Sequence, residues 1–246
     1  MSLGKNDFSI FNKFKFERQP VAVKFLYYKP EGIQKLKTKL TFCAMLPEAQ
    51  KGEAFYATKE DHVCEGTFPL GQTDIPPLFT SGSIVAGVDQ VDELRAGREV
   101  YRVLPRLEKD TANYVAFSPL DKLSFDPDVL VVTATIEQAE ILMRASTYSN
   151  GKLWISKTSV VLGCAWLYVY PYISGEVNYI VVGICASGML FWRILPVGQV
   201  MISIPYQQLP TVINNLNNMP WEHAVEPPKG TPKEVVNTIK HDLLGL

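Results

Sequence analysis

Two segments of the sequence repeat one arrangement of cysteine, glycine and glutamate, and this repeat constrains the fold more than any other feature. Cys43 and Cys64 enclose 20 residues, as do Cys164 and Cys185. Each segment opens on Cys-Ala and contains Gly-Glu, then a tyrosine three residues after the glutamate. The corresponding residues are Cys43-Ala44, Gly52-Glu53, Tyr56 and Cys64 in the first segment, and Cys164-Ala165, Gly175-Glu176, Tyr179 and Cys185 in the second. The Gly-Glu pair lies two residues later in the second segment, so the match requires small gaps.

The flanking sequence predicts the same elements around both segments. A strand and a helix precede each first cysteine, and a strand and a helix follow each second one. β-branched and aromatic runs predict strands, and apolar residues at helical spacing predict helices. The predicted strands are residues 20–28, 54–57, 84–88, 113–117, 129–133, 177–182 and 200–204, and the predicted helices are residues 7–17, 31–40, 43–50, 90–96, 136–145, 207–216 and 231–245.

These elements predict the α/β class (mixed α+β), with a layered sheet and helices in one domain spanning residues 1–246. The repeat predicts two copies of a β-α-α-β-α-β-α unit, residues 18–100 and 126–217, related by a pseudo-two-fold axis. A C-terminal helix over 231–245 follows, because Thr231 and Glu234 form a capping-box pattern around Pro232. Residues 164–172 alternate as a strand would, but their correspondence with residues 43–50 favours a helix.

The balance of charges, the apolar runs and the first residues of the sequence indicate which partners and which compartment to expect. Lys and Arg number 24 against 25 Asp and Glu, so nothing favours a nucleic acid or an anionic membrane. Residues 158–221 carry only two charges, Glu176 and Arg193, but prolines interrupt this stretch and no run reaches the roughly 20 apolar residues of a membrane helix. The first residues show no signal-peptide pattern. We therefore expect a cytoplasmic protein with free thiols and no membrane segment.

Several motifs resemble one known family. They are residues 20–25 (PVAVKF), 43–49 (CAMLPEA), 61–66 (DHVCEG) with Leu70-Gly71, 125–129 (FDPDV), 163–165 (GCA), 183–185 (GIC) and Ile204-Pro205. Together they are similar to the domain of unknown function family 169, which occurs in archaea and bacteria, over roughly residues 11–216. The resemblance implies no particular reaction.

The cysteines are the candidate site residues. If the axis brings Cys43, Cys64, Cys164 and Cys185 together, four thiolates can hold an iron–sulfur cluster or a structural zinc. Short Cys-x-x-Cys pairs are absent, so buried, inert cysteines are the alternative. A third alternative is a reactive thiol at Cys64 or Cys185, each followed by a small-residue turn, with His62 as a base.

Two charged residues complete the candidate set. Glu176 and Arg193, the two charges of the 158–221 stretch, are expected either to pair with each other, to face a ligand, or to lie at an exposed turn.

Three functions remain open. The first is binding of a small molecule or cofactor between the two halves, near the cysteines. The second is a thiol-dependent or iron–sulfur-dependent enzyme or redox protein that uses the same residues. The third is a structural protein whose nearly charge-free stretch forms a homo-oligomer interface.

Overall fold

The structure, a computed structural model, describes residues 7–180 and 193–222, and residues 231, 233–234, 236–237 and 240–241. Its architecture is mixed α/β. The strands are β1 (Val21–Leu26), β2 (Gln34–Lys35), β3 (Phe55–Thr58), β4 (Tyr114–Pro119), β5 (Val129–Thr135), β6 (Asn178–Ile180) and β7 (Gln199–Pro205). They form one sheet in the order β2-β3-β4-β1-β5-β7-β6.

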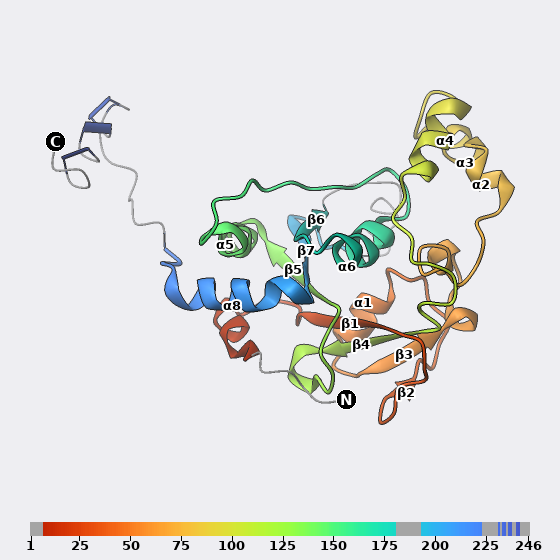
Figure 1. Cartoon of the computed structure of the whole chain (residues 1–246), viewed down its shortest axis with the longest axis horizontal. Helices are drawn as coiled ribbons and strands as arrows, with labels where there is room; N and C mark the ends of the chain where they lie inside the picture. Colours follow the sequence, from red (N-terminus) through yellow and green to blue (C-terminus); the bar gives the residue numbers. More distant parts are fainter. Residues whose placement is uncertain are drawn as a thin grey trace.

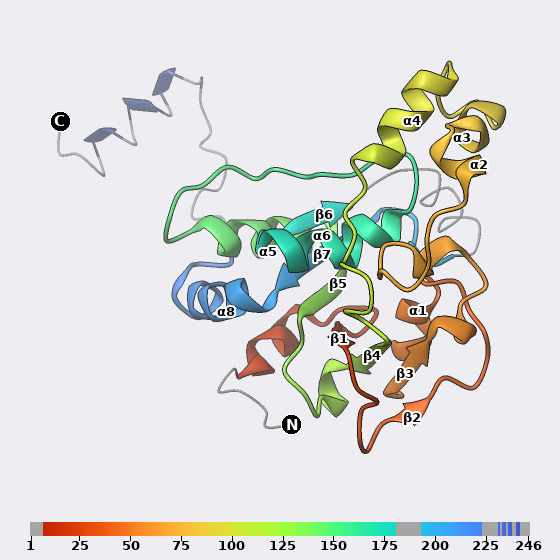
Figure 2. The ribbon, with the colours of Figure 1, turned by 45° about the vertical axis from the view of Figure 1, so that its right-hand side comes forward.

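Helices cover both faces of this sheet (Figure 1). The α-helices are α1 (Met45–Ala49), α2 (Pro77–Thr80), α3 (Ser83–Gly87), α4 (Leu94–Arg102), α5 (Ile136–Thr147), α6 (Tyr170–Ser174) and α8 (Leu209–Asn218). Five segments are 3-10 helices: η1 (Phe8–Phe14), η2 (Lys59–Asp61), η3 (Glu65–Thr67), η4 (Leu120–Lys122) and η6 (Tyr206–Gln208). A π-helix, η5 (Ala165–Val169), leads directly into α6. Helices α2, α3 and α4 gather at one end of the molecule (Figure 2).

The two faces of the sheet support separate cores, because side chains alternate along each strand. Val21 and Val131 belong to the larger core, which also takes in α1 and η5. Leu130 and Val132 point to the opposite face and pack with η1, α5 and α8. Phe125 closes that second face over β1, β3 and β4. No helix of the described residues is long and apolar enough to cross a bilayer.

Apart from β2, which lies outside β3 and has no counterpart among the described strands, the strand order is symmetric about the junction of β1 and β5. Proceeding outward, β1 is followed by β4 and β3, and β5 is followed by β7 and β6; every one of these neighbours is antiparallel. β1 and β5 are themselves antiparallel, as a two-fold axis between them requires. Val21 pairs with Pro119, and Val129 pairs with Pro205. Each proline ends its strand and precedes a 3-10 helix.

The outer strands keep the same correspondence. Tyr56 pairs with Ala116, and Tyr179 pairs with Ile202; both partners lie three residues before the strand-ending proline. Tyr56 and Tyr179 therefore hold equivalent positions in the sheet. Aligning the two Gly-Glu pairs of the sequence matches the same two tyrosines. We propose that the two halves are copies of one unit, with β4 as the last strand of the first copy. The agreement between the strand registers and the sequence alignment supports this proposal.

Two predicted elements are wrong. Residues 31–40, predicted as a helix, contain strand β2, and the Leu36 and Leu40 amides donate to the carbonyls of Tyr56 and Asp61. Pairing with the segment around β3 therefore overrides the helical spacing. Residues 84–88, predicted as a strand, fall in and just after α3.

A close glycine contact holds α3 against α4. Gly82 adopts a φ of 83° immediately before α3, and a Cβ on Gly97 would lie 2.6 Å from the Gly82 carbonyl oxygen. The two backbones therefore touch directly, which neighbouring side chains would prevent.

The remaining elements agree with their predicted types, with shifted ends. Helix α4 begins at Leu94 rather than at residue 90, and Ile136 at the start of α5 is 67% exposed. At the C-terminus, the predicted capping box is present: the Thr231 amide donates to Glu234 at 2.6 Å and the Glu234 amide donates to Thr231 Oγ1 at 3.5 Å. Most of the predicted helix over 231–245 lies outside the described residues.

Strand β6 lies at the described edge of the sheet, where the buried side chain of Asn178 binds a neighbouring extended segment. Its Oδ1 accepts from the Lys157 amide at 2.9 Å, and its Nδ2 donates to the carbonyls of Lys157 and Trp166, also at 2.9 Å. One side chain thus ties the segment around Lys157 and the π-helix to the edge strand.

Candidate functional site

Three of the four cysteines lie where helices begin. Cys43 is half-buried just before α1, and Cys64 is half-buried at the N-cap of η3. Cys164 is buried directly before the π-helix η5. Cys185 lies outside the described residues. Cys43 lies two residues before α1 and Cys164 one residue before η5, and the proposed repeat matches these two cysteines.

The thiol of Cys64 receives two backbone hydrogen bonds. The Phe42 amide donates to its Sγ at 3.3 Å, and the Gly66 amide donates at 3.4 Å. Gly66 allows this approach because a Cβ there would clash with the Phe42 side chain and lie 3.2 Å from Cys64 Sγ. Cys64 is thereby fixed against Phe42.

Tyr168 lies on the π-helix between the two halves. Its side chain is fully buried, and its hydroxyl has no hydrogen-bond partner among the described residues. Burial raises the pKa of this hydroxyl well above its usual value, and the nearby thiols of Cys43 and Cys164 raise it further. The ring centroid lies 4.7 Å from that of Phe42. A neutral phenol therefore sits close to one thiol from each half.

His62 completes the arrangement from the segment that follows β3. Its ring lies 5.4 Å from that of Phe42, and neither Nδ1 nor Nε2 has a hydrogen-bond partner in the described part of the chain. Burial lowers its pKa to about 4, although Asp61 opposes the shift. The imidazole is therefore neutral at pH 7.

These side chains form one contiguous group, which we call the cysteine–tyrosine centre: Cys43, Cys64, Cys164, Tyr168, His62 and Phe42. Its polar groups are the three thiols, the imidazole of His62, whose pKa burial lowers, and the phenol of Tyr168, whose pKa burial raises. Among the described residues, no three His, Cys, Asp or Glu side chains are placed to hold a metal ion. The iron–sulfur and zinc expectations depend on Cys185 and stay predictions.

The charged candidates lie elsewhere. Glu176 is exposed in the turn before β6, where its Oε2 accepts a hydrogen bond from the Tyr170 hydroxyl at 2.7 Å. Arg193 is exposed with a φ of 55°, and its carbonyl accepts from Arg18. Among the described ion pairs none joins Glu176 to Arg193, and of the three alternatives Glu176 shows the exposed turn. Solvent reaches both groups, and neither requires a partner.

Sequence reasoning did not single out Tyr168, although the repeat contained a signal. The second copy has two extra residues between its first cysteine and its Gly-Glu pair. A π-helix accommodates an inserted residue and is often found at functional sites. The insertion therefore marked the segment that carries Tyr168.

A family model matches residues 9–215, which is most of the chain and includes every described member of the centre. The chain belongs to the DUF169 family. This family is described as an uncharacterised ArCR, and its description names no reaction or ligand. The predicted resemblance is thus confirmed for DUF169. No curated protein and no solved structure matches the chain.

Proposed function

We propose that this DUF169 protein binds a small molecule or cofactor at the cysteine–tyrosine centre. The observation that supports the proposal is the Tyr168 hydroxyl, fully buried without a partner in the described part of the chain. Leaving a buried polar group unpaired costs about 1–3 kcal/mol. A phenylalanine at this position would avoid that cost, so a ligand that accepts a hydrogen bond explains the tyrosine.

The surroundings indicate the ligand's character. Aromatic rings surround Tyr168. The ring centroids of Phe42 and Phe117 lie 4.7 Å and 5.9 Å from that of Tyr168, and the His62 ring lies beside that of Phe42. The described members of the centre carry no Lys or Arg, which phosphate or carboxylate groups usually require. We therefore expect the part of the ligand at Tyr168 to be uncharged and planar, with a carbonyl or ring-nitrogen acceptor.

The position of the centre agrees with the proposed repeat. Cys43 comes from the first half and Cys164 from the second, and both contribute to raising the pKa of the Tyr168 hydroxyl. Ligand sites are common where two structural units meet. The repeat thus supports a single site formed jointly by both halves.

The full chain, purified anaerobically, tests this function. Native mass spectrometry, the visible spectrum and iron and zinc analysis are compared for wild type, Tyr168→Phe and the half-exposed control Tyr148→Phe. We expect an organic molecule retained by wild type and Tyr148→Phe and lost from Tyr168→Phe. Iron with visible absorbance that requires Cys43 and Cys164 would instead support the thiol-dependent iron–sulfur function.

A second measurement applies if the ligand is lost during purification. In ligand-free protein, Tyr168→Phe removes an unpaired hydroxyl and raises the unfolding free energy by about 1–3 kcal/mol. If no molecule is retained and Tyr168→Phe lowers the stability, the hydroxyl has a partner within the chain and the proposal fails.

A further inference from the structure

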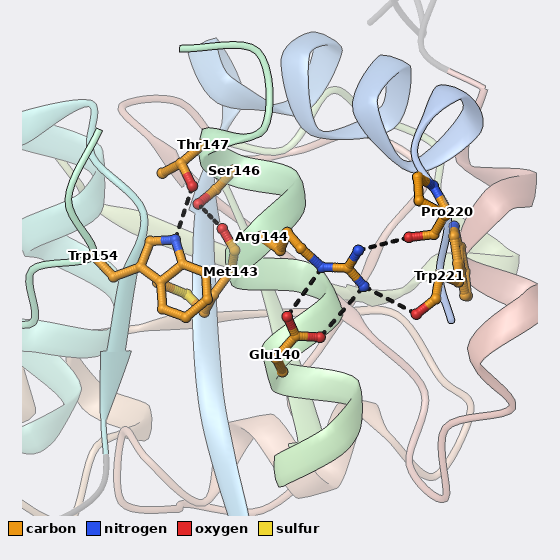
Figure 3. Close-up of polar contacts among 8 residues, drawn as sticks. All are labelled: Glu140, Met143, Arg144, Ser146, Thr147, Trp154, Pro220 and Trp221. Carbon is orange, nitrogen blue, oxygen red and sulfur yellow. Dashed lines mark hydrogen bonds and ion pairs between the residues drawn. The ribbon is translucent and has the colours of Figure 1, made fainter. Parts of the chain in front are cut away.

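A surface cavity of about 110 Å³ lies in the second half, away from the cysteine–tyrosine centre. It is formed by the end of α5, the extended segment that follows it, the turn before β6 and the last residue of η6. Its lining includes Thr147, Lys152, Trp154, Glu176 and Gln208. Figure 3 shows Thr147 and Trp154 beside Ser146 and Met143 at the end of α5, away from the Arg144 contacts with Glu140, Pro220 and Trp221.

The matching position in the first half contains an ion pair. Glu53 and Glu176 each follow a glycine with positive φ, Gly52 at 106° and Gly175 at 68°. Lys122 lies three residues after Pro119, and Gln208 lies three residues after Pro205. In the first half, Lys122 Nζ lies 2.8 Å from Glu53 Oε1. The second half therefore keeps the glutamate and replaces its lysine with glutamine.

The second half leaves the carboxylate without a cation. Gln208 Nε2 donates to the Gly175 carbonyl at 3.2 Å, so it occupies the region of Lys122 without supplying a charge. Among the ion pairs of the described residues, none includes Glu176. Lys152 lines the cavity together with Glu176, and Lys157 Nζ lies 5.5 Å from the ring centroid of Tyr170, whose hydroxyl donates to Glu176.

Trp154 supplies an aromatic surface in the same cavity. Its side chain is 46% exposed, and its Nε1 donates to Thr147 Oγ1 at 2.9 Å, which fixes the orientation of the indole (Figure 3). A tryptophan face attracts cations, and recognition of ammonium ligands commonly uses such a surface. A carboxylate and a held indole thus line one cavity.

We propose that this cavity binds the ammonium group of a small organic amine. Glu176 supplies the opposite charge, and the ligand's ammonium takes the place that Lys122 Nζ has beside Glu53. Trp154 contacts the ammonium and its attached carbons. Lys152 disfavours a second positive charge, so the ligand is a monoamine.

Butylammonium chloride is the probe, with 1-butanol as its uncharged counterpart. The indole N–H signal of Trp154, assigned with Trp154→Phe, is followed by NMR on the full chain at low ionic strength. We expect a saturable shift with butylammonium and none with 1-butanol.

Substitutions separate this site from general charge effects. Glu176→Gln should raise the Kd at least about tenfold, as loss of a charge-assisted contact predicts. Gln208→Lys should do the same, because it recreates the ion pair of the first half. Glu53→Gln is the matched control and should leave the Kd unchanged. The proposal is overturned if wild type gives no saturable shift, if Glu176→Gln binds as wild type does, or if Glu53→Gln weakens binding equally.

Discussion

Lowering the pH from 7 to 5 should destabilise the protein through His62. Burial holds the pKa of this histidine at about 4, against 6.5 for the ordinary side chain. At pH 7 the imidazole is neutral in both folded and unfolded chains, so His62 contributes no pH dependence. Between pH 6.5 and 4 the unfolded chain takes up a proton that the folded chain refuses, and stability falls as the pH falls. Below pH 4 the loss is complete.

The size of this loss follows from the shift. Each pKa unit corresponds to about 1.4 kcal/mol, so protonation of the unfolded chain alone costs about 2 kcal/mol of stability at pH 5 and about 3 kcal/mol at full titration. The ring has no hydrogen-bond partner among the described residues to offset this cost.

Urea unfolding of the full chain at pH 7 and pH 5 measures the effect. Carboxylates also titrate over this range, so the informative quantity is the pH-dependent loss of wild type minus that of His62→Phe. We expect a difference of about 2 kcal/mol. The exposed His241→Gln variant is the control and should behave as wild type. Equal pH dependence in wild type and His62→Phe would refute the claim that the buried imidazole resists protonation.

Two further predictions concern packing and access. Gly97→Ala should lower the unfolding free energy by about 1–2 kcal/mol in urea denaturation, because overpacking against Gly82 costs more than the roughly 1 kcal/mol of helix propensity that alanine gains; a stabilised variant would show that α3 and α4 separate freely. In a Cys185→Ser background, iodoacetamide should modify half-buried Cys43 and Cys64 before buried Cys164, as read by peptide mass spectrometry, and faster labelling of Cys164 would contradict its burial.

Local sequence patterns predicted most strands of the sheet, because β-branched runs such as residues 129–133 combine high strand propensity with burial on both faces. The failures lie where local pattern is ambiguous. Leu36 and Leu40 have helical spacing, yet their amides pair with the segment around β3. Residues 84–88 form an apolar run too short to distinguish a strand from a buried helix.

The candidate site was predictable in part. The repeat predicted helices at residues 43–50 and 164–172, and helical segments are found in both ranges. It did not reveal the buried position of Tyr168, because that depends on how the π-helix orients its side chains. For Glu176 and Arg193 an exposed turn was one of three alternatives, and a scarcity of charge in the sequence does not show which residues reach solvent.

The side chain of Asn178 has a consequence for association between molecules. An edge strand with free N–H and C=O groups is a template for strands of other chains, and such contacts lead to aggregation. Here the Asn178 amide binds the backbone of Lys157 from β6 and holds an extended segment against this edge. Among the described residues the protection comes from side chains, that of Asn178 and that of Ser156, whose Oγ donates to the Tyr179 carbonyl of β6. Its loss would open a surface for strand exchange between copies of the protein.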